Sequence, residues 1–189
     1  MSVEPVPDWL RPEGGFTADD LDNLPELPPH TELIDGGLIL VSPQKLLHMK
    51  LVNRLYGSLS QAAPAGLAAV REMSVVLNNR QRPEPDVSVI DADFLDDQAT
   101  WFPAKAVLLA IEVVSPSSEV MDRERKPQLY AQSGIEHFWR VEVKDDKPVV
   151  YVYELDPATS TYALSGIHRD RLKLSVPFPI DIDLTIAAN

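Results

Sequence analysis

The sequence predicts a fold of the α/β (α+β) class, in which helices flank a mixed central β-sheet. Leucines recur at four-residue spacing through Lys45–Ala62, which is the pattern of an amphipathic helix. The run Val107–Val114 is apolar apart from Glu112, which predicts a strand buried on both faces. Between Lys45 and Val143 the expected order is a helix, three strands, a helix and a strand. Such an order fits a mixed sheet with helices packed against it.

The chain has 189 residues, enough for one domain with a hydrophobic core. We expect residues 1–16 to form an N-terminal arm and residues 17–189 to form a single domain. The arm is acidic and rich in proline, which is unlike a signal peptide. After it, Thr17-Ala-Asp-Asp20 is a helix start signal. The prolines from Pro25 onward should end this short helix near Leu24.

Two short segments, Thr31–Asp35 and Leu38–Val41, flank Gly36-Gly37. This arrangement predicts a β-hairpin with a two-residue turn. Beyond it, apolar and β-branched runs bounded by turn residues predict further strands. These strands are expected at Ala69–Leu77, Val87–Ile90, His137–Val143, Val149–Leu155 and Thr161–Leu164.

Three other segments connect or end these strands. Asp91–Thr100 is acidic and is expected at the surface as a loop or a short helical turn. The strand that carries Glu112 stops at Ser115-Pro116, and a short helix is expected from about Asp122, with Gly134 as its C-terminal cap. The tail Leu172–Leu184 contains two prolines and suits an edge or an irregular strand.

The composition limits the classes of function. The chain carries 29 acidic and 17 basic residues, a formal net charge of -12. It has no cysteine, so disulfide and thiolate metal sites are excluded, and we expect a cytoplasmic protein. No apolar run approaches the length that spans a membrane. The acidic balance opposes DNA binding, which depends on Lys and Arg neutralising phosphates. Either metal ions and a local basic patch overcome this repulsion, or the partner is not long duplex DNA.

Two acids stand at the ends of apolar strands. Glu112 interrupts a buried run, and Asp86 follows Pro85 and enters the strand Val87–Ile90. If these strands are neighbours, the two carboxylates meet at one edge of the sheet. Paired carboxylates form the minimal oxygen site for a hard cation such as Mg²⁺. The alternatives are that Asp86 caps a turn and that Glu112 makes a buried ion pair.

An ordered set of residues extends this pair through the chain. It consists of Glu32-Leu-Ile-Asp-Gly36, His48, Pro85-Asp86, Glu112-Val-Val-Ser-Pro116, Asp122, Lys126, Tyr130, Gly134 and His137-Phe-Trp139. With this set the sequence resembles the PD-(D/E)XK nucleases, and most closely the Uma-type endonuclease family. The resemblance runs from about Thr17 to the C-terminus. It implies a restriction-endonuclease-like core with additional β-hairpins at both ends.

The resemblance also implies roles for particular residues. Asp86, Glu112 and Glu32 would bind Mg²⁺ or Mn²⁺, and a lysine would assist hydrolysis of nucleic acid, expected to be DNA. The superfamily places that lysine two residues after the second acid, where this chain has Val114. The family implies that Lys126 replaces it from the following helix. A homodimer, with no membrane partner, is also expected.

Each supporting residue has a structural alternative. Lys126 lies in a charged run that could face water, and Asp122, one helical turn before it, could cap the helix. Glu32 could be an exposed hairpin acid, and His48 could be a core or rim residue of the long helix. Tyr130 and Trp139 are expected to be core aromatics.

The leading hypothesis is a Mg²⁺- or Mn²⁺-dependent endonuclease. In it, Asp86, Glu112 and Lys126 are catalytic, and Glu32, Asp122 and His48 support them. The alternative is a non-catalytic, acidic interaction protein that retains the nuclease fold. The ordered acids favour the enzyme, whereas the charge of -12 and the displaced lysine favour the alternative.

Overall fold

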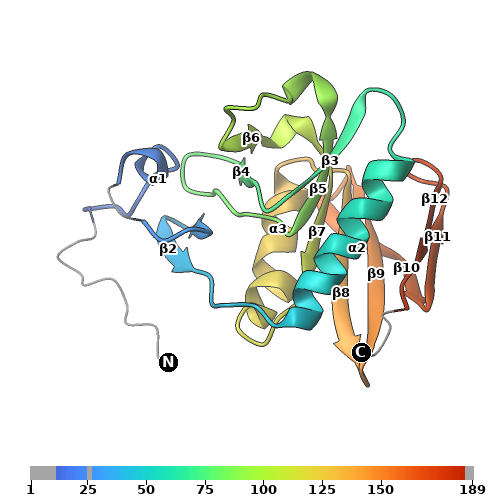
Figure 1. The fold of residues 1–189 in the computed structure, drawn as a ribbon. Helices are drawn as coiled ribbons and strands as arrows, with labels where there is room; N and C mark the ends of the chain where they lie inside the picture. The colour runs from blue at the N-terminus through green and yellow to red at the C-terminus, as the bar shows by residue number, and fades with distance from the viewer. Residues whose placement is uncertain (1–11, 25–26, 186–189) are drawn as a thin grey trace.

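A computed structural model describes residues 12–24 and 27–185, which are arranged around a six-stranded sheet (Figure 1). The strand order is β10-β9-β8-β7-β5-β3. Its central pair, β7 and β8, is parallel, and the other neighbours are antiparallel. The sheet is therefore mixed, as predicted. The six strands are β3 Leu67–Arg71, β5 Val87–Asp91, β7 Val107–Val113, β8 His137–Lys144, β9 Lys147–Asp156 and β10 Thr161–Arg169.

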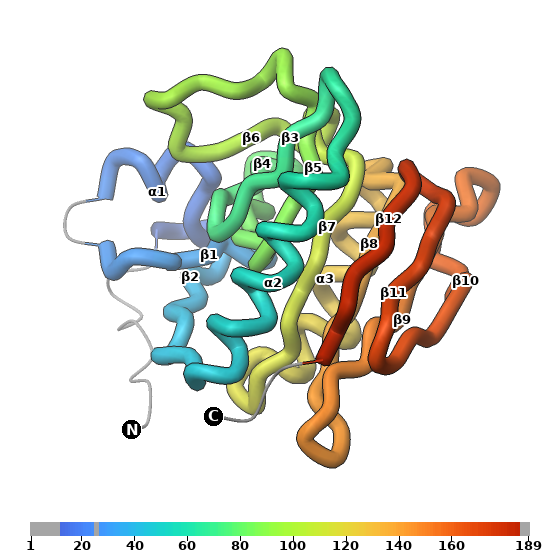
Figure 2. The backbone as a smooth tube through the Cα atoms, turned by 45° about the vertical axis from the view of Figure 1, so that its right-hand side comes forward, coloured from blue at the N-terminus to red at the C-terminus, as the bar shows by residue number. Residues whose placement is uncertain are grey.

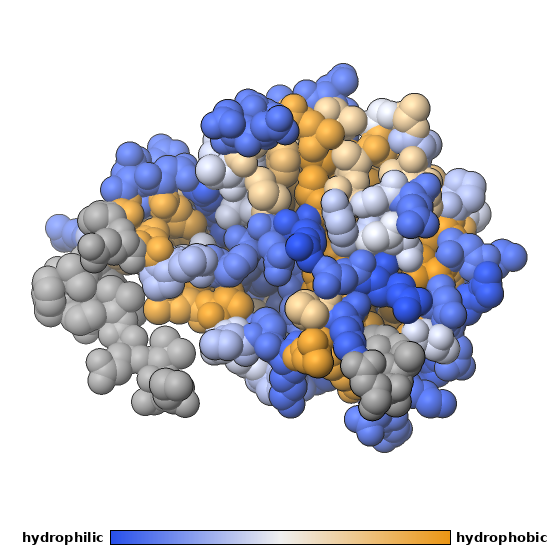
Figure 3. All heavy atoms as spheres, viewed as in Figure 1, coloured by the Kyte–Doolittle hydropathy of each residue, from blue (hydrophilic) through white to orange (hydrophobic). Residues whose placement is uncertain are grey.

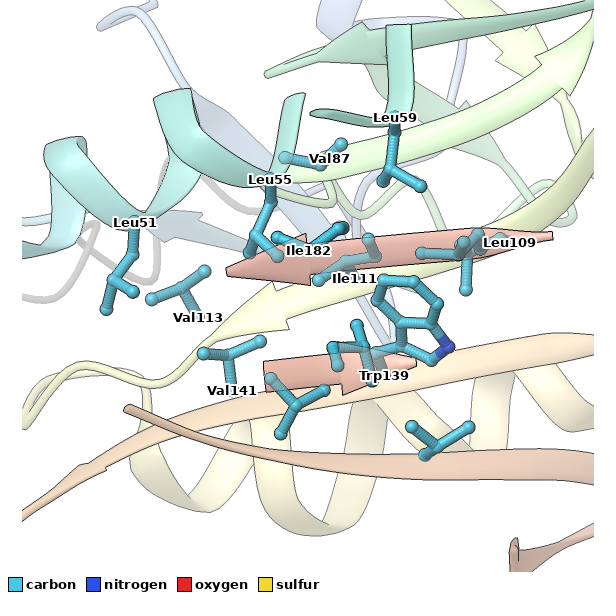
Figure 4. Packing of buried hydrophobic residues seen from close by; sticks show 14 of the residues in the cluster. Leu51, Leu55, Leu59, Val87, Leu109, Ile111, Val113, Trp139, Val141 and Ile182 are labelled. Atoms are coloured by element: carbon cyan, nitrogen blue, oxygen red, sulfur yellow. The ribbon is translucent and has the colours of Figure 1, made fainter. Parts of the chain in front are cut away.

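The helix α2, Leu46–Ala62, covers one face of the sheet as its leucine spacing predicts. Leu51, Leu55 and Leu59 are buried and point toward Trp139 and the central strands (Figure 4). The hairpin of β11, Arg171–Leu174, and β12, Ile180–Asp183, lies beside α2 on the same face (Figure 2). This face holds the larger hydrophobic core.

The helix α3, Lys126–Gln132, covers the opposite face, and one π-helical turn, Met121–Arg125, precedes it. Gly134 ends this helical segment with a φ of 79°, the left-handed conformation that favours glycine at a C-terminal cap. Tyr130 and Phe138 are fully buried on this side of the sheet. Successive side chains of β7 and β8 thus point alternately into the two cores, as expected for strands buried on both faces.

The N-terminal hairpin and helix form a separate lobe at the side of the sheet (Figure 1). The hairpin consists of β1, Thr31–Ile34, and β2, Gly37–Leu40, and the helix α1 spans Asp20–Asn23. Of the expected arm 1–16, residues 1–11 lie outside the described residues. Phe16, at its end, is 5% exposed and packs with Leu33. Two short strands, β4 Ser74–Val76 and β6 Trp101–Pro103, pair in parallel near this lobe.

Several boundaries differ from the sequence prediction. The strand expected at Thr161–Leu164 continues to Arg169 as β10, where it pairs along β9. The hairpin turns at Asp35-Gly36, one residue earlier than expected, because both residues adopt positive φ and suit a type I′ turn. The expected strand Ala69–Leu77 is divided into β3 and β4, since Glu72 has a φ of 53° and breaks the extended chain. The tail forms a regular hairpin, β11–β12, rather than one irregular strand.

The surface agrees with the polar composition. Hydrophilic side chains cover much of the face seen in Figure 3, with apolar areas between them. Among the described residues, no helix has both the length and the apolar character needed to cross a membrane.

Candidate functional site

The strand register brings the two expected acids together. In the antiparallel pair β5–β7, Val87 lies opposite Ile111, so one further step along the ladder places Asp86 opposite Glu112. The Oδ2 atom of Asp86 accepts a hydrogen bond from the backbone N–H of Val113 at 2.6 Å. The side chain of Asp86 therefore adds one hydrogen bond at the end of the ladder, and its charge is near enough to raise the pKa of Glu112.

Glu112 is 2% exposed and has a partner on each carboxylate oxygen. The hydroxyl of Tyr130 donates to its Oε1 atom at 2.5 Å. The Nζ atom of Lys126 donates to its Oε2 atom at 3.1 Å. Glu112 thus makes a buried ion pair, which was the structural alternative, in addition to lying beside Asp86.

Lys126 is buried among acids rather than solvated, with 4% of its surface exposed. Its Nζ atom also lies 2.8 Å from Oε1 of Glu32 and 3.5 Å from Oδ1 of Asp122. Lys126 adopts helical backbone angles although Pro127 follows it. The proline is tolerated because it stands in the first turn of α3, where the backbone N–H needs no acceptor within the helix.

Glu32 lies on β1 of the N-terminal hairpin, which places it in this cluster. Leu33 and Arg82 exchange two backbone hydrogen bonds, at 3.0 and 2.7 Å, which join β1 to the segment before Asp86. The backbone N–H of Glu84 then donates to Oε1 of Glu32 at 2.7 Å. Glu32 is 4% exposed, so it is not a solvated hairpin acid.

His48 approaches the cluster from the opposite side, near the start of α2. Its Nε2 atom lies 3.3 Å from Oδ1 of Asp86, and its side chain is 12% exposed. Burial alone would lower the pKa of His48, but the hydrogen bond and charge of Asp86 outweigh it, so the pKa is raised. His48 also lines a cleft of about 400 Å³ between α2 and the segment after β7. Asp86, 20% exposed, is the most accessible of the acids that contact His48 or Lys126.

Burial and mutual repulsion control the charges of the cluster. Burial raises the pKa of Glu112 well above its ordinary value, although the Lys126 ammonium opposes this, and the charges of Asp122, Asp86 and Glu32 raise it further. Burial likewise raises the pKa of Asp122 to about 6, against the lowering effect of Lys126. Burial would lower the pKa of Lys126, but the surrounding acids outweigh it and raise it. Lys126 is therefore a permanent cation.

One carboxylate oxygen in the cluster is fully buried without a hydrogen bond. Asp122 is 1% exposed, and its Oδ2 atom accepts a hydrogen bond from the hydroxyl of Ser118. Its Oδ1 atom is buried without a hydrogen bond and has only the longer contact with Lys126. An acceptor of this kind is costly to bury, and additional positive charge nearby would offset that cost.

The donor set fits a hard divalent cation. Glu32, Asp86, Glu112 and Asp122 supply carboxylate oxygens, the ligands that Mg²⁺ and Mn²⁺ prefer. The single positive charge of Lys126 cannot neutralise all four carboxylates. Among residues 12–24 and 27–185, however, no three His, Asp or Glu side chains are arranged to hold a metal as they stand. Lys126 already contacts Glu32, Glu112 and Asp122, so a bound metal would compete with its ammonium for these carboxylates.

Comparison with known proteins identifies a family and a similar fold. Residues 18–187 match the model of the Uma2 family, described as "Putative restriction endonuclease". The chain belongs to the Uma2 family. A solved structure with a similar fold is described as a "putative nuclease belonging to DUF820" from Anabaena variabilis ATCC 29413. It has a TM-score of 0.66 and 17% identity, over 86% of this chain and 89% of the other. The comparison with curated proteins found no match.

In this Uma2 family member, the contact of Tyr130 with Glu112 was not expected from the sequence. Tyr130 was expected to be a core aromatic, and its ring is indeed buried, but its hydroxyl holds Glu112. The available signal was its spacing, since a residue four positions after Lys126 lies on the same helix face. Ser118, which bonds Asp122, follows the same spacing. Trp139 is a core residue as expected.

Proposed function

We propose that the protein is a metal-dependent endonuclease that hydrolyses phosphodiester bonds in DNA. The observation that carries the proposal is the contact of Lys126 with Glu32, Glu112 and Asp122, beside Asp86. The Uma2 family description and the similar fold of the solved DUF820 protein, itself described as a nuclease, support this reading. A cytoplasmic location is part of the proposal.

The roles follow from the contacts of each residue. Asp86 and Glu112 would hold Mg²⁺ or Mn²⁺ with Glu32 as a further ligand, and the ion would supply Lewis-acid polarisation of the phosphate and a water of lowered pKa. Lys126 places a compact cation at the cluster, where it can donate to the attacked phosphate or orient the attacking water. Tyr130 and His48 orient the carboxylates of Glu112 and Asp86.

Asp122 is a supporting residue in this scheme. It contributes negative charge beside Lys126 and keeps the ammonium protonated. The proposed entry route is the cleft lined by His48, because His48 contacts Asp86, which is 20% exposed, while Glu112 is covered. A phosphodiester approaching along this route would meet His48, which contacts Asp86.

A cleavage screen tests the proposal. Single- and double-stranded DNA and RNA are incubated with the protein and Mg²⁺ or Mn²⁺, beside an Asp86→Asn variant. Asp97→Asn is the matched control, since Asp97 is exposed and lies outside the cluster. We expect cleavage by the wild type and the control, and a loss of about 100-fold or more in Asp86→Asn. Equal cleavage by all three proteins, or by none, contradicts the proposal.

A second candidate is a non-catalytic, acidic interaction protein with the same fold. The net charge of -12 favours it, as does the position of Lys126, which already neutralises part of the cluster. Calorimetric titration separates the candidates. The enzyme binds Mg²⁺ or Mn²⁺ and loses that affinity in Glu112→Gln, whereas the interaction protein shows no binding that depends on Glu112.

We also infer that the protein forms a homodimer. The edge strand β10 leaves Leu164 and Ile167 51% and 52% exposed, and unpaired edges of this kind invite association. A two-fold pair of sites suits cleavage of both strands of a duplex. Light scattering at micromolar concentration should give twice the chain mass of 21.0 kDa. A monomer mass contradicts the inference.

A further inference from the structure

A second cleft, of about 470 Å³, lies on the other side of the helical segment that carries Lys126. Pro127, Gln128 and Ala131 of α3 form one wall. The opposite wall comes from β8, β9 and β10, and it is aromatic. The cleft is separate from the one lined by His48 and is not part of the proposed metal site.

The aromatic wall consists of three rings, of which Phe138 and Tyr162 are stacked and Tyr153 is tilted against them. The rings of Phe138 and Tyr162 lie 5.4 Å apart at 23°, and the ring of Tyr153 lies 5.7 Å from Phe138. Phe138 is fully buried, but Tyr153 and Tyr162 both keep exposed surface. The hydroxyl of Tyr162 donates to the carbonyl of Ile135, which fixes its ring in place. Two partly exposed tyrosines therefore line the wall, and a hydrogen bond fixes one of them, Tyr162.

The lining of this cleft contains more basic than acidic side chains. Its lining includes Arg123 and Arg140 and a single acid, Glu124, in a protein with a net charge of -12. The guanidinium of Arg140 stands over the ring of Tyr153, with its Cζ atom 5.6 Å from the ring centroid. Glu142, outside the lining, pairs with both Arg123 and Arg140 at 2.9 Å. Guanidinium groups beside aromatic rings suit a ligand that is both planar and anionic.

Arg123 connects the two clefts. It lines the aromatic cleft and also the cleft that contains His48. Its side chain is 40% exposed and is held by Glu142 at 2.9 Å and by Glu119. A chain of phosphates that runs from one cleft to the other must pass this guanidinium.

We propose that the aromatic cleft binds an unstacked base of single-stranded DNA, with Arg123 contacting the phosphate between that base and the cleft at His48. This inference rests on the proposed function and adds the substrate class to it. Base-to-aromatic stacking tolerates any sequence, because every base presents a planar face. A duplex would need to open locally to place a base there.

Binding is measured by fluorescence anisotropy of a labelled single-stranded oligodeoxynucleotide, at fixed salt and with EDTA present to prevent cleavage. Gln128→Trp fills the cleft from an exposed helix position, so it leaves the core intact. Tyr162→Leu removes one ring of the wall. The control is Gln61→Trp, which adds the same side chain at an exposed position of α2 outside the cleft.

We expect Gln128→Trp and Tyr162→Leu each to weaken binding about tenfold, and Gln61→Trp to bind as the wild type does. An oligonucleotide of abasic sites should bind the wild type about tenfold more weakly than the normal one. The abasic oligonucleotide should bind Gln128→Trp with the same affinity as it binds the wild type. If both cleft variants bind single-stranded DNA as tightly as the wild type, the inference is overturned.

A parallel cleavage assay with Mn²⁺ separates this inference from the proposed function. Stacking-dependent binding without any cleavage supports the aromatic cleft and contradicts the nuclease. Cleavage that is equal in wild type, Gln128→Trp and Tyr162→Leu supports the nuclease and overturns the aromatic cleft. Circular dichroism and thermal unfolding show whether Tyr162→Leu is folded. If it is not, the binding and cleavage of Gln128→Trp alone test the aromatic cleft.

Discussion

The Nζ atom of Lys126 lies 3.1 Å from the Oε2 atom of Glu112, and both side chains are almost fully buried. The two residues come from different elements, the strand β7 and the start of α3. In the PD-(D/E)XK pattern the lysine would stand two residues after the acid, where this chain has Val114. Lys126 therefore reaches Glu112 across the fold rather than along the strand.

Replacing Lys126 with methionine should affect both stability and cleavage. It leaves Glu32, Glu112 and Asp122 buried without their cation, which should reduce the free energy of unfolding by about 3–5 kcal/mol. Cleavage, assayed below the melting temperature, should fall about 100-fold, while binding of Mn²⁺ is retained because methionine removes no ligand. Chemical denaturation, calorimetry and cleavage rates measure the three quantities.

The matched control is Lys105→Met, since Lys105 is exposed on the turn Ala104–Ala106 before β7. We expect it to keep the stability and the cleavage rate of the wild type. A Lys126→Met protein that cleaves at the wild-type rate, or a Lys105→Met protein that does not cleave, counts against the displaced lysine.

Asp122 should make stability depend on pH in a defined direction. Its pKa is about 6 in the folded protein, against an ordinary value of 3.8. The folded state therefore holds this proton more tightly than the unfolded state. The resulting stabilisation is complete below about pH 4 and is lost as the pH rises through 6. Over that interval the loss is on the order of 3 kcal/mol.

The comparison uses Asp122→Asn, which cannot titrate. The free energy of unfolding of this variant, relative to the wild type, should increase between pH 4 and pH 7. Asp97→Asn should follow the wild type in parallel, because Asp97 is exposed. Curves for Asp122→Asn and wild type that stay parallel over this interval would contradict the predicted titration.

Divalent metal should stabilise the folded protein. Because the acids around Lys126 are disposed to bind a cation only when folded, Mn²⁺ or Mg²⁺ at about 100 times its Kd should add about 2.7 kcal/mol to the free energy of unfolding. For a chain of this size that raises Tm by about 5–10 °C. Glu112→Gln should show a smaller rise, and Asp97→Asn the full one. Melting curves that are identical with and without saturating metal would remove the support for the metal site.

The hydroxyl of Tyr130 should stabilise the fold through Glu112. Tyr130→Phe keeps the ring in its core position but removes the hydrogen bond to a buried carboxylate. The expected loss is about 1–3 kcal/mol in the free energy of unfolding, measured by urea denaturation. Tyr56→Phe is the control, since Tyr56 is only partly buried on α2. Equal stability of the two variants would show that the Tyr130 hydroxyl contributes little.

Much of the fold could be predicted from local patterns in the chain. The leucine spacing of Lys45–Ala62 and the apolar run at Val107 correspond to α2 and β7. These predictions succeeded because helix and strand periodicity depends on near neighbours. The split between β3 and β4 was missed, because Glu72 adopts a positive φ that its residue type does not signal.

The sequence indicated which residues form the candidate site, but not which of them contact one another. The positions of Asp86 and Glu112 at strand ends indicated that they could meet, and the register of β5 and β7 brings them together. That Lys126 is buried among three acids, and that Tyr130 holds one of them, depends on how α3 packs against the sheet. Packing joins residues far apart in the chain, and their interactions are set by geometry that no local pattern specifies.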